Sequence, residues 1–239
     1  MGSFRIGLPA RLSAATIETL VNSLAEAKAS DARVWVLEGE DPDAFCRGMD
    51  LSSVANAEEG RVAVGRFAEA LRLLSNAPRP TVAVVHAEAL GGGVGIMAAC
   101  DLVVASEKAS VALPEGLFGI LPAMIMPSLL TRMSPQKARL LSLTCTAAPA
   151  TWAHDAGLFD RLSAPEKLER AKKRAVRDLS RVNPGAVARL RSLIHMADDT
   201  AFEPALEKAT EIAAETVADA EVQRTVALFL EEGVAPWTA

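Results

Sequence analysis

Three short apolar runs constrain the fold of this chain more than any other feature. They are RVWVL at residues 33–37, TVAVV at 81–85 and LVVAS at 102–106. Each run is continuously hydrophobic rather than alternating, which is typical of strands that are buried on both faces of a parallel sheet. Helical patterns separate the runs, so the sequence predicts an α/β arrangement with a covered sheet.

Two helices are predicted in the first third of the chain. Ser13 is a suitable N-cap for the first, whose inward face would carry Ile17, Leu20, Val21 and Leu24. The second is expected over residues 59–76, ending before Pro78 and Pro80. Its expected inward residues are Val62, Phe67, Leu71 and Leu74.

From Pro122 onward the pattern is almost entirely helical, with a long basic helix expected over residues 164–182. The basic run KLERAKKRAVR, residues 167–177, is typical of a solvated helix face. The chain is predicted to divide into an α/β part, residues 1–160, and a helical region, residues 161–239. This second region is expected to pack on the first part or on another subunit.

Composition limits the classes of partner. The formal net charge of −5 argues against nucleic acid, because phosphate backbones select basic surfaces. Cys46, Cys100 and Cys145 are widely spaced and only three histidines occur, so neither disulfides nor a metal site is expected. The sequence shows no signal peptide and no stretch that approaches a membrane span, so we expect a cytoplasmic protein with no membrane partner.

The glycine run GGGVG, residues 91–95, follows the second apolar run and precedes a short helical pattern. Gly93, Gly95 and Ala98 match the dinucleotide fingerprint G-x-G-x-x-A, with Glu115 twenty residues after Gly95. The following helix is too short for a crossover helix and Glu115 lies past the next strand, which both count against that interpretation. Tight packing alone would need only one or two glycines.

A third interpretation joins the glycine run to two other stretches. The loop FCRGMDL, residues 45–51, offers a second backbone amide at Met49. The stretch LPEGLFGILPA, residues 113–123, places Glu115 in an apolar setting, where burial raises a carboxyl pKa toward working pH. Amides of this kind polarise a thioester carbonyl and hold the enolate, while the glutamate moves the proton of the adjacent carbon.

At these stretches the chain resembles the crotonase, or enoyl-CoA hydratase/isomerase, superfamily. FCRGMDL and PTVAVVHAEALGGGVGIMAACDLVVAS resemble its two oxyanion loops, and VALPEGLFGILP resembles its third block. The resemblance implies a ββα spiral core with a C-terminal helical trimerisation region, assembled as a trimer or a hexamer. It also implies a substrate carried as a CoA or phosphopantetheine thioester, with no other cofactor.

The same resemblance assigns roles to individual residues. The oxyanion amides fall on Met49 and Gly92, and the catalytic carboxylate falls on Glu115. The substrate-binding positions implied are Cys46, Arg47, Gly48, Gly91, Gly93 and Leu113, and no metal ligand is implied. Met124, Met126 and Met133 are expected in the core or in the lining of the acyl pocket.

Two departures from the family pattern narrow the expected activity. The family's other catalytic glutamate would stand at Gly95, and its PGxGG segment is replaced by LPAMIMPSLL at residues 121–130. The stretches EGLFGILPAMIMPSLLTRM and EEGVAPW are similar to the dehydratases of polyketide β-branching. That similarity implies removal of water from 3-hydroxy-3-methylglutaryl-acyl carrier protein to give 3-methylglutaconyl-acyl carrier protein.

Two other functions remain open at the level of sequence. A Δ3,Δ2-enoyl thioester isomerase of this superfamily can work with a single glutamate. The glycine at position 95 also fits a noncatalytic subunit that scaffolds a partner enzyme. Four arginines are expected either to bind the phosphate of a CoA or phosphopantetheine arm, to contact the acidic face of a carrier protein, or to form a solvated helix face: Arg47, Arg61, Arg66 and Arg72.

Overall fold

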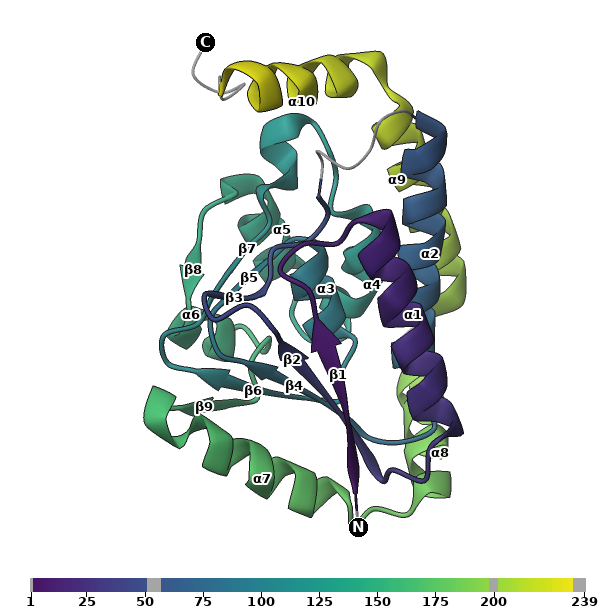
Figure 1. Ribbon diagram of the computed structural model, residues 1–239, viewed down its shortest axis with the longest axis vertical. Helices are drawn as coiled ribbons and strands as arrows, with labels where there is room; N and C mark the ends of the chain where they lie inside the picture. Colours follow the sequence, from purple (N-terminus) through teal and green to yellow (C-terminus); the bar gives the residue numbers. More distant parts are fainter. Residues whose placement is uncertain (1, 51–56, 198–201, 234–239) are drawn as a thin grey trace.

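The computed structural model describes residues 2–50, 57–197 and 202–233. Its main sheet has five parallel strands in the order β1-β2-β4-β6-β9 (Figure 1). These strands are β1 (Ser3–Leu8), β2 (Val34–Gly39), β4 (Thr81–Val85), β6 (Leu102–Ser106) and β9 (Arg161–Ser163). A smaller sheet contains β3 (Ala44–Cys46), β5 (Glu88–Leu90), β7 (Ser110–Ala112) and β8 (Ala148–Pro149), in that order.

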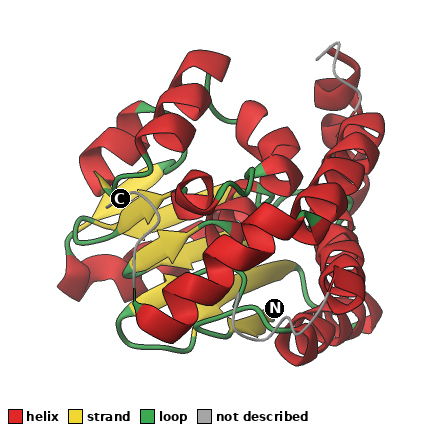
Figure 2. Ribbon diagram, turned by 90° about the horizontal axis from the view of Figure 1, so that it is seen from above, coloured by secondary structure: helices red, strands yellow, loops and turns green. Residues whose placement is uncertain are grey.

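Helices surround the two sheets (Figure 2). The α-helices are α1 (Ala14–Ala29), α2 (Ala57–Ser75), α3 (Gly92–Ala98), α4 (Met126–Leu130), α5 (Pro135–Thr144), α6 (Ala150–Asp155), α7 (Leu168–Leu179), α8 (Pro184–Ala197), α9 (Phe202–Ala218) and α10 (Ala220–Glu232). Short 3₁₀ helices follow some strands and turns: η2 (Pro114–Phe118), η3 (Ala123–Ile125) and η4 (Pro165–Lys167). None of the described helices is both long enough and apolar enough to cross a bilayer.

The main sheet is covered on both faces, as the continuous apolar runs predict. On one face Val36, Val84 and Val104 pack with Leu168 and Ala175 of α7. Side chains from the opposite face of the same strands belong to the large central core, which includes Trp35, Leu37, Ala83, Val85 and Val103. The mixed α/β class is therefore confirmed.

The helix α1 begins and packs as predicted, whereas the prediction that Val62 of α2 faces inward is wrong. Ser13 caps α1 by accepting from the Thr16 amide, and the predicted apolar face of the helix is buried. In α2, Val62 is 55% exposed, while Ala63 and Val64 are buried. Residues three or four positions apart share one face of a helix, as Val64 and Ala63 do with Phe67. Val62 lies five positions before Phe67 and therefore falls on another face.

The segment after Pro122 is less uniformly helical than predicted. It contributes β8 to the small sheet and β9 to the main sheet, where Val104 pairs with Arg161. Its last helices pack on the same chain, since α9 lies along α2 and buries Leu206, Ala209 and Ala213 (Figure 1). Packing on the first part is thus confirmed, and the division at residue 160 stays a prediction.

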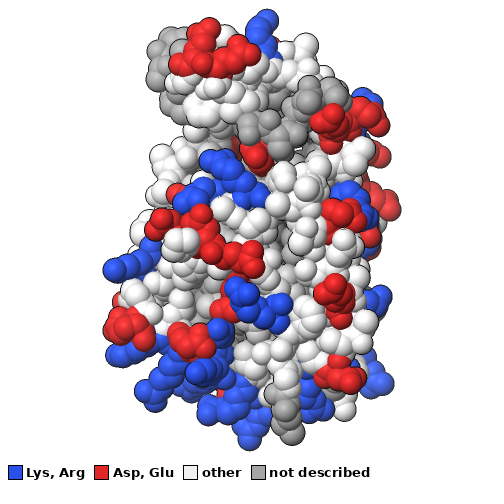
Figure 3. Space-filling model, in the orientation of Figure 1, with Lys and Arg blue, Asp and Glu red and all other residues white. Residues whose placement is uncertain are grey.

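The basic helix α7 forms a solvated face, as its sequence predicts. Figure 3 shows Lys and Arg gathered at the end of the molecule that carries α7. Lys173, Arg174 and Arg177 have side chains that are 70–75% exposed. Lys172 instead reaches the sheet, where its ammonium lies 2.9 Å from Glu38.

Candidate active site

The small sheet brings three distant stretches of the chain to one edge. Its strands β3, β5 and β7 are parallel, with Cys46 opposite Ala89 and Leu90 opposite Ala112. The carboxyl ends of parallel strands meet at the same edge, and ligands of α/β proteins bind just outside it. The turns that follow these strands therefore lie together, although they are separated by dozens of residues in sequence.

The first turn presents the backbone of Met49 beside the second turn. Gly48 has φ +73°, and a methyl group on it would lie 2.8 Å from the backbone nitrogen of Gly92. Two backbone bonds secure the turn: the Leu12 amide donates to Gly48, and the Asp50 amide donates to Leu12. Glycine at 48 thus allows the turn to approach the start of α3.

The second turn starts a short buried helix. Gly91 has φ +47°, and its amide donates to the carbonyl of Ala112 at 3.0 Å. All residues of α3 are buried, and the amides of its first turn have no carbonyl partner within the helix. A methyl group on Gly93 would lie 2.9 Å from the carbonyl carbon of Cys46 and would overlap its oxygen. These contacts hold β3 against the N-terminus of α3.

The third stretch carries Glu115 on η2, directly after β7. Pro114 begins this 3₁₀ helix and Gly119, at φ +73°, ends it. One carboxylate oxygen, Oε1, lies 2.6 Å from the position that a methyl group on Gly91 would take. The other, Oε2, is buried and has no hydrogen-bond partner among the described residues.

Burial changes the acidity of this carboxyl group. The pKa of Glu115 rises from an ordinary 4.5 to about 7, because desolvation penalises the charged form. The residue as a whole is only half-buried, but its unpartnered oxygen has lost its solvent. Glu115 is therefore suited to take up and return a proton near neutral pH.

Met49, Gly92 and Glu115 line one cavity of about 80 Å³. The structure thus brings together the three residues to which the sequence assigns catalysis. The rest of the lining is apolar: Val64, Phe67, Ile120, Leu121, Pro122, Met124, Ile125, Ala213 and Val217. Such a cavity can hold a short apolar group next to Met49, Gly92 and the carboxyl of Glu115.

Most of this lining was not predicted. Val64 and Phe67 come from α2, and Ala213 and Val217 from α9, far along the chain. Of the three methionines expected in the core or the acyl pocket, Met124 lines the cavity, Met133 is buried in the core and Met126 packs against the core. The other lining residues carry no sequence signal beyond hydrophobicity, which core residues share.

The six residues predicted to bind substrate lie within three positions of Met49, Gly92 or Glu115 in the sequence. Gly48, Gly91 and Gly93 permit the close backbone contacts of the two turns. The other three are Cys46, Leu113 and Arg47. Cys46 is a buried strand residue, and burial raises the pKa of its thiol to about 11. Leu113 is a buried residue just before η2. None of the six is among the residues that line the described cavity, and their role toward substrate stays a prediction.

The four arginines considered for phosphate binding are all paired with carboxylates. Arg47 contacts Glu88 at 2.9 Å, and Arg72 contacts Glu203 at 2.9 Å. Arg61 pairs with Glu58 on the same helix, and Arg66 with Glu18 of α1. Their charges are thus already partly balanced within the chain.

The two departures from the family pattern meet in space. A side chain at Gly95 would begin 2.7 Å from Cβ of Ile125 and would overlap its Cγ2. Ile125 belongs to the segment that replaces the glycine-rich one, and it is 2% exposed. A carboxylate at position 95 therefore has no room while isoleucine occupies position 125.

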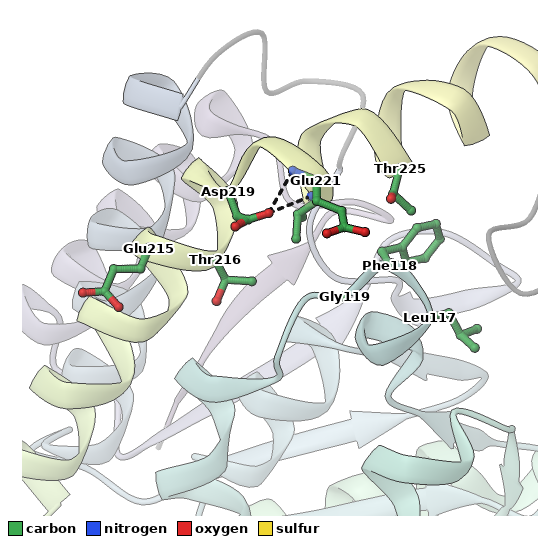
Figure 4. A pocket seen from close by; sticks show the side chains of 9 residues that line it. Leu117, Phe118, Gly119, Glu215, Thr216, Asp219, Glu221 and Thr225 are labelled. Carbon is green, nitrogen blue, oxygen red and sulfur yellow. Dashed lines mark hydrogen bonds between the residues drawn. The ribbon is translucent and has the colours of Figure 1, made fainter.

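A wider pocket of about 650 Å³ lies between the end of η2 and the helices α9 and α10 (Figure 4). Its ionisable side chains are Glu215, Asp219 and Glu221. Asp219 caps α10 by accepting from the amides of Glu221 and Val222, shown as dashed lines in Figure 4. An acidic lining does not suit an anionic carrier, so the smaller cavity beside Glu115 is the better candidate for chemistry.

Comparison with known proteins agrees with this geometry. The family model "Enoyl-CoA hydratase/isomerase" matches residues 9–239. The chain belongs to the enoyl-CoA hydratase/isomerase family. It is 29% identical over 227 residues to the bacillaene synthase dehydratase PksH of Bacillus subtilis, covering 92% of this chain and 85% of that protein.

Other members of the family are similar over different spans. The mitochondrial enoyl-CoA hydratase domain-containing protein 3 of Rattus norvegicus is 32% identical to this chain over 185 residues. The match covers 74% of this chain and 60% of the rat protein. An enoyl-CoA hydratase structure from Mycobacterium avium superposes with a TM-score of 0.81 at 28% identity, covering 95% of this chain and 88% of that one. The crystal structure of PksH gives a TM-score of 0.82 at 24% identity, over 94% and 89% of the two chains. The crotonase fold is thereby confirmed.

Proposed function

We propose that this protein is a dehydratase of a branched 3-hydroxyacyl thioester. The observation that carries the proposal is the single cavity shared by Met49, Gly92 and the protonatable Glu115. The proposed substrate is 3-hydroxy-3-methylglutaryl-acyl carrier protein, and the product is 3-methylglutaconyl-acyl carrier protein in polyketide β-branching. The match to PksH over 92% of the chain supports this choice within the family.

The proposed reaction begins with the thioester oxygen between the two amides. The N–H groups of Met49 and Gly92 donate to that oxygen and stabilise the negative charge that develops there. Glu115 removes the proton from the adjacent carbon, and the electron pair of that C–H bond forms the enolate. Collapse of the enolate forms the new C–C double bond and breaks the bond from the third carbon to its hydroxyl.

The hydroxyl leaves as water because it receives a proton. Glu115, protonated in the first step, returns this proton on the same face. A tertiary carbon releases a hydroxyl more readily than a secondary one, which lowers the need for a second carboxylate. This is consistent with a site whose cavity has Glu115 as its only ionisable side chain among the described lining residues.

The carrier and the assembly complete the proposal. The substrate arrives as a thioester of CoA or of the phosphopantetheine arm of an acyl carrier protein, and no further cofactor takes part. The protein acts in the cytoplasm as a homotrimer or hexamer, with neither nucleic acid nor membrane as a partner. The exposed apolar side chains of α8, Leu190, Leu193 and Ile194, are suited to contact between subunits.

The second candidate is a Δ3,Δ2-enoyl thioester isomerase. The apolar lining of the cavity favours it, since an uncharged acyl chain needs no cation and the lining offers none among the described residues. One carboxyl that removes and returns a proton on neighbouring carbons is sufficient for this reaction.

Mass spectrometry separates the candidates. The purified protein is incubated with a 3-hydroxy-3-methylglutaryl thioester and, separately, with a 3-enoyl thioester, each on pantetheine and on an acyl carrier protein. We expect the first substrate to lose the mass of one water. Turnover of the 3-enoyl thioester alone, with unchanged mass and a shifted double bond, would establish the isomerase instead. Absence of both binding and turnover would leave the noncatalytic scaffold.

A further inference from the structure

Ile125 stands between α3 and the cavity that contains Glu115. It is the last residue of η3, its side chain is almost fully buried, and it lines the cavity together with Glu115 and Gly92. Its other side lies against Gly95, where a methyl group would come within 2.7 Å of the Ile125 Cβ. The absent side chain at position 95 therefore provides the space that Ile125 fills.

Ile125 is also a rigid part of the cavity wall. A β-branched side chain has restricted χ1 freedom, so it cannot easily swing aside for a larger ligand. Met49 and Met124, which line the same cavity, are unbranched and adapt their shape more readily. The cavity, at about 80 Å³, is far below the range of roughly 300–1,000 Å³ that is usual for ligand pockets. The acyl group is therefore limited by Ile125 together with the other β-branched lining residues, Val64, Ile120 and Val217.

We propose that Ile125 is a specificity-determining residue, which restricts the site to short acyl groups by filling the space beside Gly95. The inference rests on the proposed function only in so far as the ligand is an acyl thioester bound in this cavity. It predicts that a smaller residue at 125 lets longer acyl chains bind, and that a larger residue at 95 weakens binding by moving Ile125 into the cavity.

The test measures binding, so that it does not depend on turnover. The pantetheine thioesters of crotonic acid and of oct-2-enoic acid, which is four carbons longer and also longer than a glutaryl chain, are titrated calorimetrically into the purified protein. The wild-type protein should bind the crotonyl thioester and discriminate against the octenoyl one. Ile125→Ala removes three carbons, and should improve octenoyl binding by about tenfold or more while changing crotonyl binding far less.

Two control variants separate selectivity from general loosening of the core. Leu129→Ala deletes a similar side chain from the neighbouring helix α4; Leu129 is fully buried but does not line the cavity. It should keep the wild-type preference for the crotonyl thioester. Ile125→Val removes a single carbon and, if Ile125→Ala folds poorly, should still shift the preference in the same direction.

The reciprocal substitution tests the contact itself. Gly95→Ala forces Ile125 toward the cavity, and should weaken crotonyl binding by about tenfold and lower the melting temperature. Combining it with Ile125→Ala should remove part of both effects, because the overlap with the Ile125 Cγ2 is gone and only the contact with Cβ, at 2.7 Å, remains. Such non-additivity is the signature of two residues that share one space.

The outcomes distinguish this inference from the proposed function. If the wild-type protein binds crotonyl thioester but Ile125→Ala keeps the wild-type chain-length preference, Ile125 is not the determinant and the proposed function stands. Independent effects of Gly95→Ala and Ile125→Ala would overturn the inference in the same way. Failure of the wild-type protein to bind either thioester would overturn the inference, whereas the proposed function falls only if the 3-hydroxy-3-methylglutaryl thioester is not dehydrated in the mass-spectrometric assay.

Discussion

The Glu115→Gln variant is expected to lose at least about 10³-fold in the rate of thioester turnover, because glutamine cannot take up the proton of the adjacent carbon. Glutamine keeps nearly the same shape, so the cavity and the two turns should remain in place. The measurement is steady-state kinetics on the substrate identified by mass spectrometry. Glu40→Gln, which alters an exposed carboxylate, should leave the rate unchanged. Retained turnover in Glu115→Gln would remove Glu115 from the mechanism.

The stability of the same variant supplies its control for folding. The folded-state pKa of Glu115, about 7, lies above its ordinary value of 4.5. Its contribution to stability is therefore fully present below pH 4.5 and is lost as the pH rises through about 7. The loss amounts to at most about 3 kcal/mol of unfolding free energy. Glutamine does not ionise, so the variant should be the more stable protein above about pH 8. A pH-independent difference would contradict this assignment of the pKa.

The Gly93→Ala variant is expected to lose about 10²- to 10³-fold in turnover, the usual effect of losing one oxyanion donor. Its methyl group overlaps the carbonyl oxygen of Cys46, so β3 has to move away from α3. The turn that follows β3 moves with it, which separates the Met49 amide from that of Gly92. The overlap should also lower the unfolding free energy by about 1–3 kcal/mol.

A matched glycine elsewhere isolates the cause of this effect. Gly65 lies on the exposed side of α2, and a methyl group there meets no atom within 4 Å. Gly65→Ala should leave turnover unchanged and stabilise the helix by up to about 1 kcal/mol. Both variants are compared at a temperature where circular dichroism shows each to be folded. If Gly93→Ala retained the wild-type rate, the close contact between β3 and α3 would not matter for catalysis.

The sequence alone predicts the parts of the fold that local patterns determine. Continuous apolar runs predict β2, β4 and β6, and the Ser13 cap predicts the start of α1. The short strands β3, β5 and β7 are not evident, because three residues are too few for a periodic pattern. Yet these strands bring the turns of the candidate site to one edge. The proximity of the turns therefore follows from their chemistry and from the family resemblance, not from a strand pattern.

The cavity wall was the least predictable part of the site. Whether Val62 or Val64 faces inward depends on a shift of two positions along α2, and both are valines in an apolar stripe. Ala213 and Val217 reach the cavity only because α9 packs along α2, which is a long-range contact without a local signal. The contact between Gly95 and Ile125 likewise joins two residues whose departures from the family pattern are separate in sequence.

The central claim is that the amides of Met49 and Gly92 and the carboxyl of Glu115 act on one thioester. Exchange of α-protons tests it most directly, with butyryl-pantetheine in deuterium oxide as a ligand that has no hydroxyl to lose. Nuclear magnetic resonance should show the wild-type protein replacing the protons next to the carbonyl by deuterium, and Glu115→Gln failing to do so. Exchange that is equally fast in the variant, or a wild-type protein that dehydrates its substrate without exchanging these protons, would contradict the account.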